Sequence, residues 1–404
     1  MNQSTISHRK IIWILGSLAT ISPFAIDLYL PAFAQIAKDF GTTSAVISLS
    51  VSSYFVGMGI GQILYGPLLD RYGRKKPLYI GLAVFILASI GCMQSWNVPS
   101  LVAFRFLQAL GGSVAWVGAV TMVRDFFPVE ESARIFSLLF LVIGVSPLLA
   151  PTIGGFIVTS LGWQAIFIGL AVIATTITSI ALVYLPEGHA PDPTISLKPK
   201  HMLLTFYEVL RNPQFSKYAF AGAFSFCTLF IYVAGSPIIF MEVFQVSPKV
   251  YGGIFALLSV GFIGGGQINI LLTRKYTSER IFRAALIGQL IASLVFVLGV
   301  WSGWLGLYGV IVMFFICLSC IGLTNPNGNA LALAPFTRTV GSASALLGCT
   351  QIGVASLVSI GVGLFNAVDA LPIVALMALT SIIALTILLA GRESTSSLAS
   401  SFKS

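Results

Sequence analysis

Two charged side chains lie deep inside long apolar stretches of the sequence. Asp27 stands about seven residues before the end of the first stretch, and Arg105 stands about seven residues after the start of the fourth. At about 1.5 Å per helical residue, each lies roughly 10 Å from the same membrane surface, so the two side chains are expected to meet. Ionisable groups in hydrocarbon are costly, and they usually serve transport or ion pathways.

These two residues suggest proton chemistry. A buried carboxylate can bind and release a proton, whereas an arginine stays protonated. Asp27 is therefore predicted to carry a proton, and Arg105 to set its affinity for that proton. Gln108, one helical turn beyond Arg105, is expected to supply a hydrogen bond, and Tyr29 and Tyr54 are candidates for lining the same substrate cavity. Two structural alternatives stay open: a static ion pair between two helices, and packing of the tyrosines in the core.

The stretches that hold these residues are predicted membrane spans. The chain of 404 residues is 57% hydrophobic and only 9% charged, unlike a soluble protein. Twelve apolar runs are each long enough to cross about 30 Å of hydrocarbon as a helix. We place them at about residues 11–34, 44–69, 77–95, 98–122, 135–158, 163–185, 216–241, 250–272, 281–300, 305–333, 341–366 and 371–391. Their continuous hydrophobicity favours helices over β-barrel strands, so the predicted fold is all-α.

A polar interval at residues 186–215 divides the spans into six and six. It is predicted to be a cytoplasmic linker between an N-terminal six-helix bundle, residues 1–185, and a C-terminal one, residues 216–404, which ends in a short cytoplasmic tail. The sequence Gly-Ile-Gly-Gln-Ile at residues 59–63 returns as Gly-Gly-Gly-Gln-Ile at residues 264–268, six helices later. Two pseudo-symmetric bundles of this kind are a recurrent plan for transporters.

The net charge of +9 follows from membrane topology. With the N-terminus in the cytoplasm, 19 of the 22 Lys and Arg residues fall in cytoplasmic segments, Lys38 and Lys249 fall in outer loops, and Arg105 lies in the membrane. The positive-inside rule explains this division without a nucleic-acid partner. Both termini are therefore predicted to be cytoplasmic. A competing interpretation of residues 8–34 is a cleaved signal peptide, although removing it would leave an odd number of spans.

The five cysteines all fall inside predicted spans, where a thiol packs as a small apolar side chain. Cys317 and Cys320 form a C-x-x-C pair, but no second pair and no histidine accompany them, so neither a metal site nor a disulfide framework is expected.

The loop after the second predicted span carries a specific motif. Residues 66–76 read Gly-Pro-Leu-Leu-Asp-Arg-Tyr-Gly-Arg-Lys-Lys, which resembles the G-x-x-x-D-R-x-G-R-[KR] signature of the major facilitator superfamily. A purely basic loop explains the cations but not the aspartate or the two glycines. The resemblance implies a conformational latch, made by the motif residues Gly66, Asp70, Arg71, Gly73 and Arg74, with Asp70 facing the start of the eleventh helix.

Two further segments resemble motifs of the same superfamily. Leu101, Arg105, Gln108 and Ala109 match its second signature, with Ala109 where glycine is commoner. The fifth span is similar to the G-P-x-x-G-G element of drug antiporters, with Ala150 in place of the first glycine; the candidate residues of this element are Pro147, Pro151, Gly154 and Gly155. Together with Asp27-Leu28-Tyr29-Leu30-Pro31, these motifs resemble the Bcr/CflA-type drug-resistance branch over essentially the whole chain.

The resemblance implies a monomeric drug:proton antiporter of the bacterial inner membrane, which exports small amphiphilic drugs and uses the proton gradient, with no cofactor. Some related exporters have a second acidic residue two turns before the membrane aspartate, where this chain has Ala19. This departure favours neutral or weakly charged substrates such as phenicols. Proton-coupled uptake by the same Asp27 and Arg105 stays open as an alternative. A membrane enzyme is disfavoured because we find no catalytic motif, and a channel because we find no selectivity filter.

Overall fold

The computed structural model describes residues 8–127, 129–188, 191–192, 206–336, 340–364 and 369–390, and these are helical with no strand. Within these described ranges, twelve helical segments are long and apolar enough to cross a membrane, which confirms the all-α fold and the predicted number of spans. The linker is described only in part, and the C-terminal tail beyond residue 390 lies outside the described residues.

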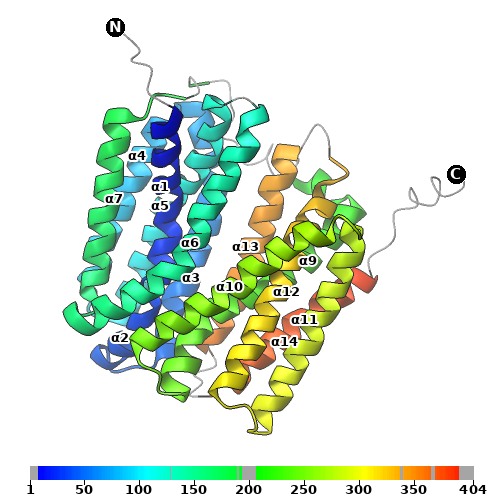
Figure 1. The fold of residues 1–404 in the computed structure, drawn as a ribbon. Coiled ribbons are helices and arrows are strands. Elements are labelled where there is room, and N and C mark those ends of the chain that lie inside the picture. Colours follow the sequence, from blue (N-terminus) through cyan, green and yellow to red (C-terminus); the bar gives the residue numbers. More distant parts are fainter. Residues whose placement is uncertain are drawn as a thin grey trace, which may run out of the picture. The chain divides into compact units, whose positions relative to one another are not determined.

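The helices are shown in Figure 1. Those of the first half are α1 (His8–Asp27), the 3₁₀ helix η1 (Leu30–Ala32), α2 (Phe33–Asp39), α3 (Ser44–Tyr72), α4 (Lys75–Met93), α5 (Val98–Phe126), α6 (Val129–Leu161) and α7 (Gln164–Tyr184). Those of the second half are α9 (Pro213–Pro237), the π-helix η2 (Ile238–Val243), α10 (Pro248–Leu272), α11 (Ser278–Trp301), α12 (Leu307–Leu333), α13 (Val340–Leu364) and α14 (Leu371–Ala390).

Two compact units contain these helices. Unit 1 comprises residues 1–197 together with 233–257 and 360–369, and unit 2 comprises residues 198–232, 258–359 and 370–404. In unit 1, α3 and α4 each pack along α5, and α1 contacts α5, α6 and α7. In unit 2, α11 packs against α12 and α14.

Local sequence explains where several helices begin and end. Asn97 and Ser100 form a capping box at the start of α5, in which the Ser100 backbone N–H donates to Asn97 Oδ1 over 2.9 Å. Thr277 caps α11 by accepting a hydrogen bond from the Arg280 backbone N–H. The C-terminal end of α3 lies at Gly73, whose φ of +83° is a conformation that other residues rarely adopt.

The first membrane span is interrupted, which its sequence signals through one proline. Pro31 has no backbone N–H, and in a continuous helix its ring would clash with the carbonyl of Asp27 four residues earlier, so α1 ends at Asp27 and η1 leads into α2. In the interruption the Tyr29 backbone N–H donates to the Ile26 carbonyl, not to the Ala25 carbonyl that a continuous helix would use. The Ala25 carbonyl is thereby free to accept a side-chain donor.

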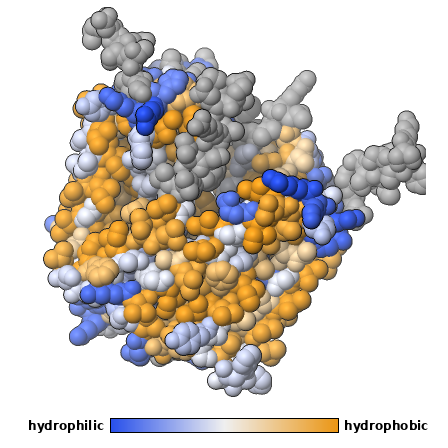
Figure 2. Space-filling model, in the orientation of Figure 1, coloured by the Kyte–Doolittle hydropathy of each residue, from blue (hydrophilic) through white to orange (hydrophobic). Residues whose placement is uncertain are grey.

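The exterior suits a lipid environment. Large apolar side chains are exposed on many of the spans, among them Leu87, Val172, Leu257 and Leu298. Figure 2 shows hydrophobic residues gathered across the visible face and hydrophilic residues nearer the helix ends. Exposed apolar surface of this extent is expected where lipid tails replace water as the solvent. The chain is a multi-pass membrane protein.

Candidate functional site

The guanidinium of Arg105 occupies the centre of a buried polar site in unit 1. The Arg105 side chain on α5 is fully buried. Its guanidinium carbon lies 4.6 Å from the ring centre of Tyr29 and 4.2 Å from that of Tyr54 on α3, with Phe167 of α7 at 6.0 Å. Aromatic faces attract a cation, most strongly where water is excluded. The structure therefore brings the two predicted tyrosines onto the predicted arginine.

The hydrogen bonds of Arg105 depend on the interruption of the first span. Arg105 Nη1 donates to the freed Ala25 carbonyl over 3.1 Å and to Gln108 Oε1 over 2.6 Å. Gln108 is held in turn, because its Nε2 donates to Ser89 Oγ of α4 over 2.7 Å. Among the described residues, Arg105 Nε and Nη2 are buried and have no acceptor. A guanidinium with two such nitrogens keeps the capacity to bind a further acceptor.

Asp27 lies at the end of α1 and is the only acidic residue among the buried side chains of the described chain. Its Oδ2 accepts a hydrogen bond from Ser146 Oγ of α6 over 3.2 Å. A buried carboxylate with a single neutral donor is poorly compensated, so its charged form is costly. This arrangement favours a group that exchanges protons.

The expected direct pairing of Asp27 with Arg105 is not formed: within the described ranges, no ion pair of 4.0 Å or less joins the two residues. The physical reason is that Arg105 turns toward the Ala25 carbonyl and the aromatic rings, while Asp27 turns toward α6. Equal depth along two helices does not fix the rotation of either helix. The sequence held no signal for Ser146 as the donor to Asp27. Pro31 indicates a break in the first helix, but it does not indicate that the freed Ala25 carbonyl accepts from Arg105.

The glycine of the antiporter-like element packs α6 against the interrupted span. A Cβ atom at Gly154 would collide with the backbone carbonyl oxygen of Leu28, in the turn that follows α1. Only glycine permits this approach, because the colliding atom belongs to the backbone and cannot rotate away. Pro147 and Pro151 lie within the same helix, close to Ser146 in sequence. The element therefore brings α6, with the donor to Asp27, against the site.

We expect Gly154→Ala to lower transport at least tenfold, because α6 must move away from Leu28 to accept the methyl group. Gly169→Ala on α7 is the matched control, since no atom lies within 4 Å of a Cβ built there. Initial rates in proteoliposomes, normalised to the amount of folded protein, measure the effect. Equal rates for the two variants would contradict the packing role.

The motif between α3 and α4 forms a second polar cluster. Arg74 makes an ion pair with Asp70 and another with Asp125 of α5, where Nε lies 2.7 Å from Oδ2. Although burial lowers the pKa of the Arg74 guanidinium, hydrogen bonds to Asp125 and Asp70 outweigh this effect and raise the pKa above its ordinary value. Asp125 was not among the predicted site residues, although an aspartate beside Arg124 at a helix end was a signal for it.

The start of the linker is attached to this cluster. Glu187 Oε1 accepts hydrogen bonds from the backbone N–H groups of Arg74, over 2.7 Å, and Lys75, over 3.1 Å, at the start of α4. A carboxylate at a helix N-terminus is favourable because the N–H groups there are otherwise unpaired. The guanidinium of Arg71 lies 5.8 Å from the ring centre of Tyr72, and a Cβ at Gly66 would meet no atom within 4 Å. The predicted approach of Asp70 to the start of the eleventh helix, α13, joins two different units and stays a prediction.

Arg74→Ala is expected to lower turnover at least tenfold and to change equilibrium drug binding less than threefold, because the cluster lies far from Arg105 along α5 and biases a conformational equilibrium. The matched control is Arg283→Ala, which removes an exposed pair with Glu279 whose side chains are 50% and 47% exposed. Exposed pairs contribute little. An equal loss of binding and turnover in Arg74→Ala would contradict the latch.

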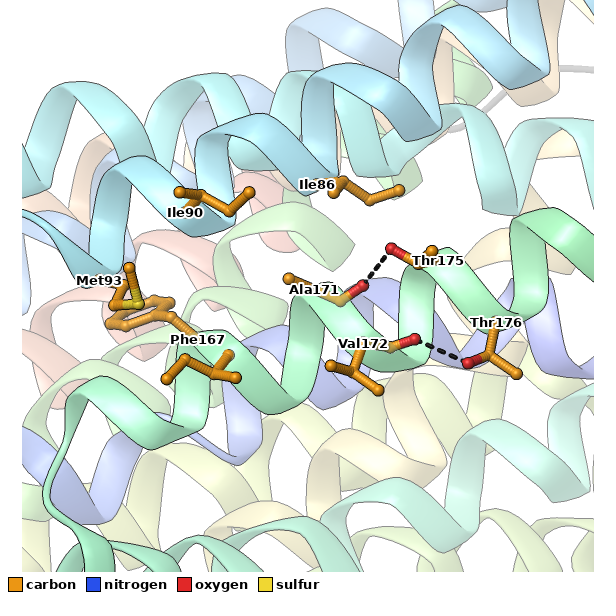
Figure 3. A pocket seen from close by; sticks show the side chains of 9 residues that line it. Ile86, Ile90, Met93, Phe167, Ala171, Val172, Thr175 and Thr176 are labelled. Carbon is orange, nitrogen blue, oxygen red and sulfur yellow. Dashed lines mark hydrogen bonds between the residues drawn. The ribbon is translucent and has the colours of Figure 1, made fainter.

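A separate cavity between α4 and α7 does not resemble a site for polar substrates (Figure 3). It has a volume of about 470 Å³ and is lined mainly by apolar side chains, including Ile86, Ile90 and Phe167. The hydroxyls of Thr175 and Thr176 donate to the carbonyls of Ala171 and Val172 in their own helix. These hydroxyl groups thus have no donor left for a ligand, and we do not assign the cavity a role in transport.

Metal chemistry has no candidate in the described part of the chain, where no group of three or more His, Cys, Asp or Glu side chains could hold an ion. Cys317 is buried, Cys320 is half-buried, and both are free thiols. The polar sites are built instead from arginine, carboxylates, amides and hydroxyls.

Twelve spans with a buried ionisable site define a membrane transporter. The family model of the Major Facilitator Superfamily matches residues 15–360, and the chain belongs to this family. This finding confirms the resemblance on which the motif analysis depended. The members of the family are transporters, not enzymes.

Three curated relatives match nearly the full length. An uncharacterized MFS-type transporter, YdgK, from Bacillus subtilis is 33% identical over 92% of each chain. The bicyclomycin resistance protein homolog from Haemophilus influenzae is 28% identical over 86% of this chain and 87% of the relative. The multidrug resistance protein MdtL from Escherichia coli is 29% identical over 87% of this chain and 88% of the relative. Drug-resistance proteins are thus among the relatives.

Solved structures support the fold. A D-xylose-proton symporter covers 94% of this chain with a TM-score of 0.71 and 15% identity, and it is itself covered to 97%. A POT family transporter in complex with 5-aminolevulinic acid has a TM-score of 0.73 and 14% identity, with 94% of each chain covered. At these identities the likeness concerns the fold alone.

Proposed function

We propose that this protein exports small amphiphilic drugs from the bacterial cytoplasm in exchange for protons. The observation that carries the proposal is the environment of Asp27, a buried carboxylate with one neutral donor, Ser146, in the same unit as the fully buried Arg105. Proton exchange at Asp27 changes the charge of the site, and such a change biases a conformational equilibrium. Relatives named for bicyclomycin resistance and multidrug resistance support export of drugs.

The proposed mechanism is alternating access. The two sequence halves, residues 1–185 and 216–404, would move relative to each other, with the linker at 186–215 joining them. Arg105 keeps two nitrogens for an acceptor, either the Asp27 carboxylate or an oxygen of the drug. Because proton binding at Asp27 would change the charge of the site, it would change the affinity of the site for the drug, and this coupling is the basis of exchange.

We place the protein in the bacterial inner membrane with both termini in the cytoplasm. The orientation follows from the basic residues at the helix ends near His8 and in the loop after α3, which are Arg9, Lys10, Arg71, Arg74, Lys75 and Lys76. One chain holds the complete site, so a monomer suffices, and the proton gradient replaces any cofactor.

Everted membrane vesicles test the proposal. Drug-panel members such as chloramphenicol and florfenicol should accumulate inside the vesicles when a proton gradient is imposed, and a protonophore should abolish accumulation. Proton-coupled uptake of a metabolite into right-side-out vesicles, without any drug export, would instead favour the symporter. The two directions are distinguished by the orientation of the vesicles.

A further inference from the structure

Three amide side chains in unit 2 form a cluster that the proposed mechanism does not use. Asn325 and Asn329 lie one turn apart on α12, and Gln351 lies on α13. Gln351 Nε2 donates to Asn329 Oδ1 over 2.7 Å and to Asn325 Oδ1 over 3.4 Å, and Asn329 Nδ2 donates to Asn325 Oδ1 over 3.2 Å. We call these three residues the amide cluster.

The amide cluster retains hydrogen-bonding capacity. An amide offers two donor hydrogens and one acceptor oxygen. Among the described residues, Asn325 Nδ2 and Gln351 Oε1 take part in no hydrogen bond, and neither is among the fully enclosed unpaired atoms. Asn325 is half-buried and Gln351 is buried, but neither of these two atoms is fully enclosed. Polar groups within membrane spans face the protein interior or a water-filled cavity and not the lipid, so this donor and this acceptor are expected to point away from the lipid.

Another buried amide in the same unit shows what a structural polar group looks like. Gln289 is fully buried, its Oε1 accepts from Ser225 Oγ over 2.6 Å, and its Nε2 donates to the Ser225 carbonyl and to Thr228 Oγ1. Its amide is thus satisfied on both atoms by protein partners. The amide cluster differs because a donor and an acceptor remain available, which is not expected of groups that serve packing alone.

The described helices that carry the cluster, α12 and α13, have no buried charged side chain. In the described part of unit 2 the only buried charged side chain is Lys217, near the start of α9. Where α9 passes the cluster it carries Gly222, and a Cβ built there would lie 4.0 Å from Gln351 Nε2 and meet nothing closer. From Asn325 to the end of α12 the rise is about 12 Å at 1.5 Å per residue. The cluster therefore lies nearer the C-terminal end of α12, the end of the tenth span, which the predicted topology places on the cytoplasmic side.

We propose that the amide cluster binds uncharged hydrogen-bonding groups, such as amides, carbonyls and hydroxyls, of the transported molecule. This inference rests on the proposed function, and it gives the substrate a class: neutral polar amphiphiles. The Nδ2 of Asn325 donates to a substrate oxygen, and Oε1 of Gln351 accepts from a substrate O–H or N–H. Its depth makes the cluster an early contact for a molecule that enters from the cytoplasm.

The test measures binding of chloramphenicol, a neutral amide with two hydroxyls, and of tetraphenylphosphonium, a cation without hydrogen-bonding groups, to full-length purified protein. Asn325→Ala and Gln351→Ala should each weaken chloramphenicol binding about tenfold, the loss expected for one hydrogen bond, and change tetraphenylphosphonium binding less than twofold. Gln351→Glu, which places a carboxylate in the cluster, should strengthen tetraphenylphosphonium binding. Thr350→Val is the matched control, because the Thr350 hydroxyl donates to the Leu346 carbonyl of its own helix.

Several results would contradict the assignment of the amide cluster as a binding site. Unchanged chloramphenicol binding in both alanine variants overturns the assignment, as does an equal loss for both probes or a similar loss in Thr350→Val, which would indicate a packing role. If the wild-type protein exports tetraphenylphosphonium but binds no chloramphenicol, the assignment of the amide cluster as a binding site is wrong, while the proposal of proton-coupled export is retained. A wild-type protein that exports neither probe contradicts the proposed function and the cluster together. Melting temperatures of all variants show whether they are folded.

Discussion

Asp27→Asn is expected to abolish proton-driven drug export, with initial rates at least 100-fold below the wild type, while the protein still folds. Asparagine has nearly the same shape as aspartate, and its side-chain oxygen can still accept from Ser146, so the packing of α1 against α6 persists. The amide cannot bind and release a proton at physiological pH. Export driven by a pH gradient in everted vesicles measures the loss, and drug binding in detergent is expected to remain.

The matched control for this change is Asp39→Asn at the end of α2. Asp39 Oδ2 accepts a hydrogen bond from Trp163 Nε1 over 2.8 Å, which an asparagine oxygen can also accept. The control therefore removes a carboxylate from the same span without removing an acceptor, and transport should stay within threefold of the wild type. Full export by the Asp27→Asn protein would exclude Asp27 as the proton carrier.

Arg105→Ala is expected to lower transport about 100-fold and drug binding at least tenfold. The change removes the donor to the Ala25 carbonyl and to Gln108 Oε1 and leaves both acceptors buried. A buried group without its partner costs about 1–3 kcal/mol. The rings of Tyr29 and Tyr54 also lose the cation on which they pack. Equilibrium binding and vesicle transport, compared in parallel, measure the two effects.

Arg105→Lys separates charge from geometry. Lysine keeps a cation near the rings but loses the planar guanidinium. In the wild type this group donates to the Ala25 carbonyl and to Gln108 through one nitrogen and keeps its other two nitrogens for a further acceptor. We expect activity between that of the wild type and that of Arg105→Ala. Arg283→Lys, at an exposed position, should behave as the wild type. Wild-type transport by Arg105→Lys would show that the charge alone matters and that the planar geometry does not.

Part of the site could be read from local sequence. Asp27 and Arg105 stand out because ionisable residues within apolar runs are rare, and the rise per helical residue places each at a definite depth. The twelve spans follow in the same way from run length. Pro31 marks a break in the first span, and Gly73 ends α3 in a positive-φ conformation that other residues rarely adopt. All of these are properties of a residue and its neighbours along the chain.

What only the tertiary structure decided is which groups face one another. Asp27 turns to Ser146 and Arg105 to the Ala25 carbonyl, although depth alone predicted a direct pair. Arg74 meets Asp125 across 51 positions of sequence. Depth along a helix follows from counting residues, but the rotation of the helix about its axis, and the carbonyl freed by a break, are set by packing against other helices. The sequence therefore determined which residues carry charge within the membrane, and the packing determined the partners that hold each charge.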